Sequence, residues 1–162
     1  MKTTPFRPVI LSILATCTLL IAVTSCKKSN DSNNTPKLSA TFGGSQFNSS
    51  YTYAYYFTPQ SLVFIDGLQG KSGDSIYVEI VVPDSANVTS RLSLNEAQIT
   101  YYDTKALYVG YRAPSHGTIT FSKWDKTNKK IAGNFSGIIY NYTNKNDSVV
   151  VANGEFNASY AD

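Results

Sequence analysis

The chain has 162 residues, of which 14 are Lys or Arg, 11 are Asp or Glu, two are Cys and one is His. The small positive balance gives no indication of a basic surface, so neither DNA nor RNA is expected as a partner. One histidine and two cysteines are fewer than the four ligands of a structural zinc site, and neither a metal nor a cofactor is expected.

Residues 1–25 are predicted to be an export signal. Lys2 and Arg7 form a positively charged start, and Val9–Val23 forms an apolar run that is followed by small side chains. This combination is typical of a secretory signal peptide. The run is shorter than the roughly 18 to 20 residues that a helix needs to cross a bilayer, so it is not expected to be a permanent anchor.

Four residues at the end of this segment, Val23, Thr24, Ser25 and Cys26, resemble the lipobox of bacterial lipoproteins. The resemblance implies cleavage between Ser25 and Cys26 and acylation of Cys26, which would make the membrane a partner through the acyl chains. Two or three acyl chains hold a protein far more durably than one does. The alternative is a secreted protein whose cysteine lies near the cleavage site by chance.

Residues 26–37 are predicted to be the lipidated cysteine and a flexible tether, because this polar segment cannot bury enough apolar surface to fold. By resemblance, Lys27 replaces the aspartate that retains lipoproteins in the inner membrane of some bacteria. Bacteroidota surface-export signals are rich in acids after the cysteine, and this tether has only Asp31. We therefore expect a lipid-anchored cell-envelope protein of the outer membrane that faces the periplasm, with surface exposure as the alternative.

Residues 38–162 are predicted to form one all-β domain. The chain has 12 Tyr and 8 Phe, with frequent Thr and Val, and these residues favour strands. Cys17 leaves with the signal and Cys26 is acylated, so no disulfide is expected. Packing must therefore stabilise the domain.

Period-two alternation defines the first half of this domain. Gly43 and Gly44 lie between two short apolar runs, which indicates a tight hairpin. In the strand that ends at Pro59, the odd-numbered aromatic residues share one face, whereas Ile76, Val78, Ile80 and Val82 are expected to face a core. The predicted strands are Ala40–Phe42, Gln46–Phe47, Tyr51–Thr58, Leu62–Asp66 and Ser75–Val82.

The second half continues the pattern after an ambiguous segment, 84–98, which fits either a short strand or a helical turn. Polar turns are expected at 113–117, 125–130 and 144–147. In the last strand, one face is predicted to contain Val150, Ala152, Phe156 and Ala158. The predicted strands are 99–102, 107–111, 118–122, 131–142 and 149–160. Short polar turns between successive strands favour an antiparallel meander that forms a sandwich or a small barrel.

The hairpin residues also support a family resemblance. They are Ala40, Phe42, Gly44 and Phe47 in the opening hairpin, and Gly117, Ile119, Thr120, Phe121, Asp125, Lys130, Ile131, Gly133, Phe135, Val149, Val151, Asn153, Gly154 and Phe156 in the closing ones. They resemble an uncharacterised domain of Bacteroidota lipoproteins, the DUF6252-like group, in which Trp is commoner at the position of Phe47. The resemblance implies an all-β exported domain and no particular activity.

Tyrosine clusters are the best indication of a binding surface. A tyrosine presents a flat apolar ring with a polar tip, which suits sugars and protein partners. The candidate ligand-binding residues are Tyr51, Tyr53, Tyr55, Tyr101 and Tyr102. The alternative, which we favour for most of them, is packing in the core and pairing across strands.

No residue pattern indicates catalysis, and no catalytic residue is assigned. His116 lies in a predicted turn, and the chain has no G-x-S-x-G motif, so a surface histidine is expected. Glu79 and Glu155 could form the paired carboxylates of a glycosidase only if the fold brought two acids together. Acids on the solvated side of alternating strands are the expected alternative.

Several acids and serines lie at predicted turns. Asp66, Asp74 and Asp84 lack the alternating spacing of a calcium loop and are expected to stabilise turns. Three Asp-Ser pairs resemble the acceptor sequence of Bacteroidota O-glycosylation, which makes Ser75, Ser85 and Ser148 candidate glycosylation sites.

The function expected from the sequence is that of a lipid-anchored, non-catalytic binding or structural module. Its partner would be an envelope protein or a glycan. A glycan-binding module that uses exposed tyrosines is the first alternative, and an envelope hydrolase is the second.

Overall fold

The computed structural model describes residues 36–71, 74–86 and 88–161. The predicted signal peptide, Ser25, Cys26 and residues 26–35 of the predicted tether lie outside this part of the chain. The described residues form the strands β1 (Lys37–Phe42), β2 (Ser45–Asn48), β3 (Tyr51–Phe57), β4 (Leu62–Gln69), β5 (Ile76–Pro83), β6 (Thr89–Arg91), β7 (Gln98–Tyr102), β8 (Leu107–Val109), β9 (His116–Asp125), β10 (Lys130–Asn141) and β11 (Ser148–Ala161), with one 3-10 turn at Thr58–Gln60. The all-β prediction is confirmed.

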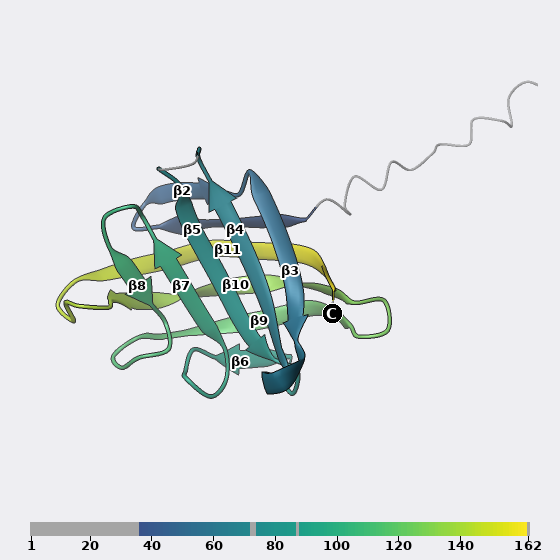
Figure 1. The fold of residues 1–162 in the computed structure, drawn as a ribbon. Coiled ribbons are helices and arrows are strands. Elements are labelled where there is room, and N and C mark those ends of the chain that lie inside the picture. Colours follow the sequence, from purple (N-terminus) through teal and green to yellow (C-terminus); the bar gives the residue numbers. More distant parts are fainter. Residues whose placement is uncertain (1–35, 72–73, 87, 162) are drawn as a thin grey trace, which may run out of the picture. The chain divides into compact units, whose positions relative to one another are not determined.

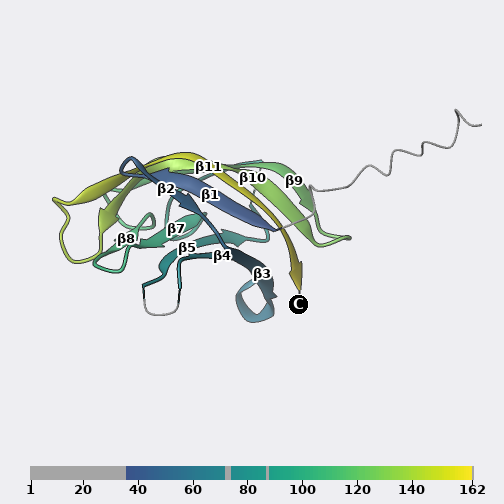
Figure 2. The same cartoon turned by 90° about the horizontal axis from the view of Figure 1, so that it is seen from above.

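The strands form two layers (Figure 1). The front layer contains β3, β4, β5, β7 and β8, and the back layer contains β2, β1, β11, β10, β9 and β6. Seen from above, the two layers lie one over the other (Figure 2). Neighbouring strands are antiparallel, with β3 and β11 as the parallel exception.

The two layers are joined along both sides. On one side the end of β11 pairs with β3, through Tyr160 and Ala54. On the other side β8 pairs with β10, through Val109 and Tyr140. Because β10 also pairs with β11, the strand pairing closes into a ring, so the structure combines the two predicted architectures, sandwich and barrel.

The core lies between the layers and follows the predicted alternation. Val78, Ile80 and Val82 of β5 point inward and have no exposed surface, as expected. Phe42 of β1 stacks on Tyr101 of β7, with ring centroids 4.1 Å apart and nearly parallel planes. This contact ties the back layer to the front layer.

The predicted hairpin between β1 and β2 is confirmed. Phe42 pairs with Ser45, so the turn contains only Gly43 and Gly44. Their φ angles of +56° and +87° lie in the left-handed region, which glycine adopts without a side-chain penalty. β1 begins at Lys37, one residue before the expected start of the domain.

The predicted inward face of β11 is wrong for Val150, which is 55% exposed, whereas Val151 is buried. One extra residue lies in β11 between Val151 and Gly154, relative to both β1 and β10, and Asn153 has a φ of +52°. Such a β-bulge shifts the alternation by one residue. Odd-numbered residues therefore face the core before the bulge, and even-numbered residues such as Phe156 face it afterwards.

Candidate functional site

The tyrosines of β3 lie on the outer surface of the front layer. Tyr51 and Tyr53 are 60% and 41% exposed, whereas the smaller Thr52 and Ala54 point inward. The predicted shared face is confirmed. Of the two roles that we favoured, packing in the core is wrong for Tyr51 and Tyr53, whereas pairing across strands is confirmed for Tyr55, whose ring stacks on that of its cross-strand partner Phe64. Tyr102 of β7 is also exposed, at 40%.

Tyr101, one of the candidate ligand-binding residues, does not lie on this surface. It is 6% exposed and points into the core, where its ring is stacked on Phe42. Tyr101 and Tyr102 are adjacent in one strand, so they necessarily point to opposite sides of the layer. Only Tyr102 is available to a ligand.

The exposed aromatic rings of β3 contact one another along the strand. The ring centroids of Tyr53 and Tyr55 are 6.0 Å apart with planes 15° apart, and those of Tyr55 and Phe64 are 4.9 Å apart with planes 3° apart. Tyr51 continues the row, 5.6 Å from Tyr53. Stacking therefore covers ring faces of Tyr53, Tyr55 and Phe64, whereas the tilted ring of Tyr51 is the most exposed of the row.

Two carboxylates lie beside this row of rings. Strand pairing aligns Tyr53, Asp66, Glu79 and Thr100 across four successive strands. Asp66 is only 1% exposed, and Glu79 is partly buried. The expectation that Asp66 lies near a loop is wrong, because β4 continues past it to Gln69. Like charges directly opposite each other on neighbouring strands destabilise a sheet, so this pair needs a physical explanation.

Tyr77 links the two acids through one hydroxyl group. Its oxygen lies 2.6 Å from Oδ1 of Asp66 and 3.1 Å from Oε2 of Glu79. The hydroxyl has one hydrogen to donate, and the shorter contact indicates that Asp66 receives it. The contact with Glu79 is therefore the weaker of the two.

The surroundings raise the pKa of Glu79 and of two neighbouring tyrosines. Burial raises the pKa of Glu79, and the charge of Asp66 raises it further, while hydrogen bonds with Tyr77 and Thr100 act in the opposite direction. Burial also raises the pKa of Tyr77, with a further contribution from its hydrogen bond with Asp66. For Tyr53, burial followed by a hydrogen bond with Asp66 raises the pKa to about 12. Both tyrosines therefore remain neutral donors at physiological pH.

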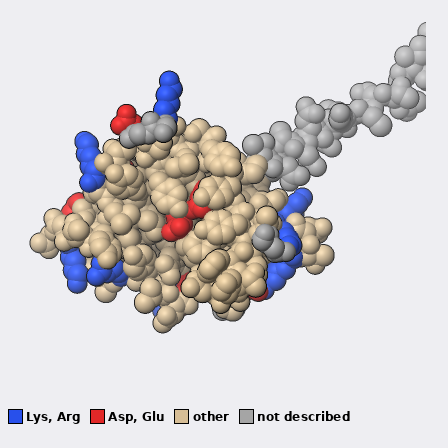
Figure 3. Space-filling model, viewed as in Figure 1, with Lys and Arg blue, Asp and Glu red and all other residues tan. Residues whose placement is uncertain are grey.

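No basic residue balances the two acids within the front layer. The five strands β3, β4, β5, β7 and β8 contain no Lys, Arg or His, and Asp66 and Glu79 are their only acids. Figure 3 shows the same distribution, with acidic atoms near the centre of an otherwise uncharged surface and basic atoms around its edge. We call this surface, formed by Tyr51, Tyr53, Tyr55, Phe64, Asp66, Tyr77, Glu79 and Tyr102, the aromatic–acidic face.

The pairing of Asp66 with Glu79 was missed from the sequence. The alternation of apolar and polar residues does predict that each acid points outward from its own strand. Their contact depends on the register between β4 and β5, and the loop between those strands leaves several registers open. Only the structure selects the register that places the acids opposite each other.

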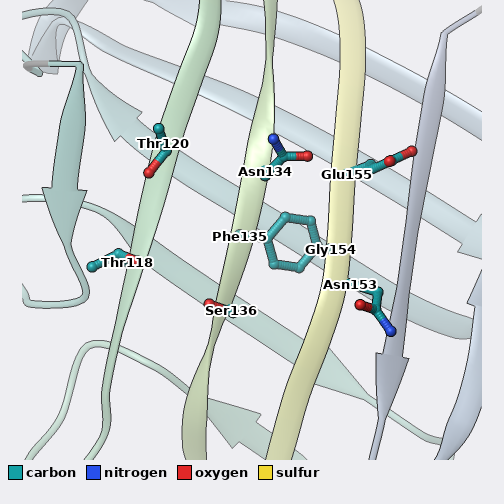
Figure 4. A pocket seen from close by; sticks show the side chains of 8 residues that line it. All are labelled: Thr118, Thr120, Asn134, Phe135, Ser136, Asn153, Gly154 and Glu155. Carbon is teal, nitrogen blue, oxygen red and sulfur yellow. The ribbon is translucent and has the colours of Figure 1, made fainter.

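A polar hollow of about 440 Å³ lies on the outer surface of the back layer (Figure 4). Side chains from three neighbouring strands surround it, and Asn153 occupies the bulge of β11. The lining residues are Thr118, Thr120, Asn134, Phe135, Ser136, Asn153, Gly154 and Glu155. Sequence reasoning missed this hollow, because the bulge that shapes it has no clear signal in the alternation.

The remaining acids singled out from the sequence do not converge on a site. Glu155 forms an exposed ion pair with Lys37 at 2.9 Å, and Asp84 forms another with Lys126 at 2.9 Å. Asp74 is exposed. Within residues 36–71, 74–86 and 88–161, no group of three or more His, Cys, Asp or Glu residues could hold a metal ion.

His116 lies where the sequence predicts it, on the surface at the start of β9. The candidate glycosylation sites differ in their surroundings. Ser85 and Ser148 are exposed, whereas Ser75 donates a hydrogen bond from Oγ to the carbonyl oxygen of Lys71 at 2.7 Å. Of the three hydroxyls, that of Ser75 is therefore the least available for modification.

No family model, curated protein or solved structure matches the chain. In the part of the chain that the structure describes, no helix is long and apolar enough to span a bilayer.

Proposed function

We propose that this protein is a lipid-anchored, non-catalytic binding module of the bacterial cell envelope, and that its ligand binds the aromatic–acidic face. The lipobox resemblance of residues 23–26 supports the anchor. The observation that supports the binding role is the outward row of aromatic rings beside one buried and one partly buried carboxylate, which no cation in the layer balances. An outer sheet surface that needed only solvation would be expected to have mixed, exposed polar residues.

The proposal of a non-catalytic role rests on the position of Asp66. A hydrolase with two carboxylates needs both of them to reach the substrate. Asp66 and Glu79 both contact the Tyr77 hydroxyl, but Asp66 is 1% exposed and the hydroxyl occupies its Oδ1 atom. This position suits a role in orienting the tyrosine hydroxyl groups, and it does not suit cleavage of a glycosidic bond.

Glycan binding is the second candidate function, with the polar hollow of the back layer as its site. The stacked rings of β3 leave little ring face on which a sugar could stack. The hollow instead offers hydroxyl, carboxamide and carboxylate groups to sugar hydroxyls, including those of Thr120, Asn134 and Glu155. Glycan binding that is lost in Asn134→Ala would favour this candidate.

The anchor is tested by metabolic labelling with radioactive palmitate. The wild-type protein is expected to incorporate the label and to enter the detergent phase on partitioning. The Cys26→Ser variant is expected to do neither, while Cys17→Ser, which changes the other cysteine, behaves as wild type. An unlabelled wild-type protein that remains in the aqueous phase would contradict the lipoprotein assignment.

The binding face is tested by screening the full-length protein on glycan and peptide arrays. A ligand of the aromatic–acidic face should be lost in the double variant Tyr53→Ala and Tyr55→Ala. It should be retained in the matched double variant Thr118→Ala and Thr120→Ala, which changes the outer surface of the other layer. Ligands that respond only to the second variant would move the binding site to the back layer.

A further inference from the structure

We propose that the aromatic–acidic face binds an extended basic segment of a protein partner, with a Lys or Arg side chain of that segment placed over Glu79. This inference deepens the proposed function, because it names the ligand of the same face. Two features of the face support it, namely its charge and its shape.

The two carboxylates of the face have no cationic partner within the front layer. Asp66 and Glu79 are neighbours on adjacent strands, and the groups that face Glu79 are Asp66 on β4, Tyr77 on β5, Tyr53 and Tyr55 on β3, and Thr100 on β7. None of these groups is a cation. Hydrogen bonds from neighbouring hydroxyl groups offset part of the cost of burying these charges, and a cation placed against them would offset more of it. Glu79, the partly exposed member of the pair, is the one that a ligand can reach.

The aromatic surroundings suit an organic cation. Stacking covers ring faces of Tyr53 and Tyr55, so a cation beside Glu79 would be held by the carboxylate rather than over a ring face. The hydroxyl oxygen of Tyr55 can accept a further hydrogen bond from the cation through its lone pairs. The methylenes of a Lys or Arg side chain would pack along the ring edges of Tyr53 and Tyr55.

The length of the face favours a polypeptide over a small amine. The aromatic row runs from Tyr51 to Phe57, which is about 20 Å at 3.3 Å per strand residue. An extended segment of about six residues covers that length, whereas one amine covers only the region near Glu79. The exposed Tyr51 and Phe57, at the two ends of the row, would contact the rest of the segment. Tyrosine-rich surfaces of this kind are typical of protein interfaces.

Binding over Glu79 should depend on pH, because the carboxyl group of Glu79 titrates. In the free protein, burial and the charge of Asp66 raise the pKa of this carboxyl group above the usual value for glutamate. A cation placed over Glu79 favours the carboxylate, so binding and protonation of Glu79 oppose each other. The affinity for a basic segment should rise with pH and level off above the pKa of Glu79 in the free protein.

Fluorescence anisotropy with the full-length protein, kept in nonionic detergent, tests this inference. The probe is a labelled hexapeptide of alternating Lys and Val, and the comparison peptide has Gln in place of each Lys. We expect the Lys peptide to bind at least about tenfold more tightly, and to weaken as salt is added. Free lysine is the third arm, and equal molar affinity for free lysine would overturn the assignment to a polypeptide.

Two matched variants separate the role of Glu79 from general acidity. Glu79→Gln preserves the shape of the side chain and should weaken binding of the Lys peptide about tenfold and abolish its pH dependence. Glu96→Gln removes an exposed acid that lies outside the aromatic–acidic face and should leave binding within about twofold of wild type. Unchanged affinity in Glu79→Gln, with circular dichroism showing a folded protein, overturns the inference.

The outcomes also distinguish this inference from the proposed function. If both peptides bind equally and Tyr55→Ala abolishes that binding, the face binds ligands but does not select a cation, so only the inference fails. If neither peptide binds, and no array ligand depends on Tyr53 or Tyr55, both fail.

Discussion

Replacing Tyr77 with Phe is the most direct test of the network that organises the aromatic–acidic face. The substitution keeps the ring and removes the hydroxyl that donates to Asp66 at 2.6 Å. A hydrogen bond to a charged group contributes about 1.5 to 3 kcal/mol. Asp66 is 1% exposed and cannot regain water without movement of its neighbours, whereas Tyr77 is partly exposed, so we expect a loss of about 2 kcal/mol in the free energy of unfolding at pH 7.

Urea denaturation followed by circular dichroism measures this loss. With a denaturant slope of about 2 kcal/mol per molar, the midpoint should fall by about 1 M. The matched control is Tyr102→Phe, on the same layer, which removes a hydroxyl that donates to the exposed backbone carbonyl of Thr104 at 3.1 Å. That variant should lose no more than about 0.5 kcal/mol, because water replaces the lost acceptor.

A double-mutant cycle with Asp66→Asn identifies the interaction itself. If the hydroxyl acts through the carboxylate, the coupling energy between Tyr77→Phe and Asp66→Asn should be at least about 1 kcal/mol. The hydrogen bond with Tyr77 also lowers the pKa of Glu79, so Tyr77→Phe should move that pKa further upward in a carbon-13 NMR titration. A Tyr77→Phe protein as stable as wild type, with additive effects in the cycle, would refute the reasoning.

Three further substitutions have defined outcomes. The pKa of Glu79 is raised in the folded state, so ionisation costs stability as pH rises through that range, and Glu79→Gln should be more stable than wild type at pH 7 but not at about pH 3. Phe42→Ala removes a ring that is 2% exposed and stacked on Tyr101, and should cost about 3 to 5 kcal/mol in urea denaturation. Asn153 has a φ of +52°, so Asn153→Val should cost about 1 to 2 kcal/mol by thermal unfolding, whereas Asn153→Gly should cost little.

A defined outcome would contradict each of these three predictions. A Glu79→Gln variant that loses stability at pH 7 would mean that the carboxylate is held favourably despite its burial beside Asp66. A loss below about 1 kcal/mol in Phe42→Ala would mean that the two layers repack without the ring. Equal stability of Asn153→Val and Asn153→Gly would remove the backbone argument for the bulge of β11.

Local features of the chain determined the elements of the fold. Alternation in β5 predicted which side faces the core, and the two glycines after Phe42 predicted the first hairpin, because both signals depend only on neighbours in sequence. The same alternation placed the β3 tyrosines on one shared face. It could not say whether that face is inside or outside, since aromatic residues suit both positions.

The features decided by tertiary structure all depend on distant strands. The pairing of β11 with β1, β3 and β10 joins the two layers, and the bulge at Asn153 reverses the inward side of β11, which is why Val150 is exposed.

An all-β chain, the turns of its main hairpins and the residue types on each side of a strand could be predicted from the amino-acid order, because these follow from backbone preferences and period-two alternation. The contact of Asp66 with Glu79, beside an outward row of tyrosines, could not. That contact depends on the register between β4 and β5 and on which side of the front layer the back layer covers. Both are set by packing across the whole domain.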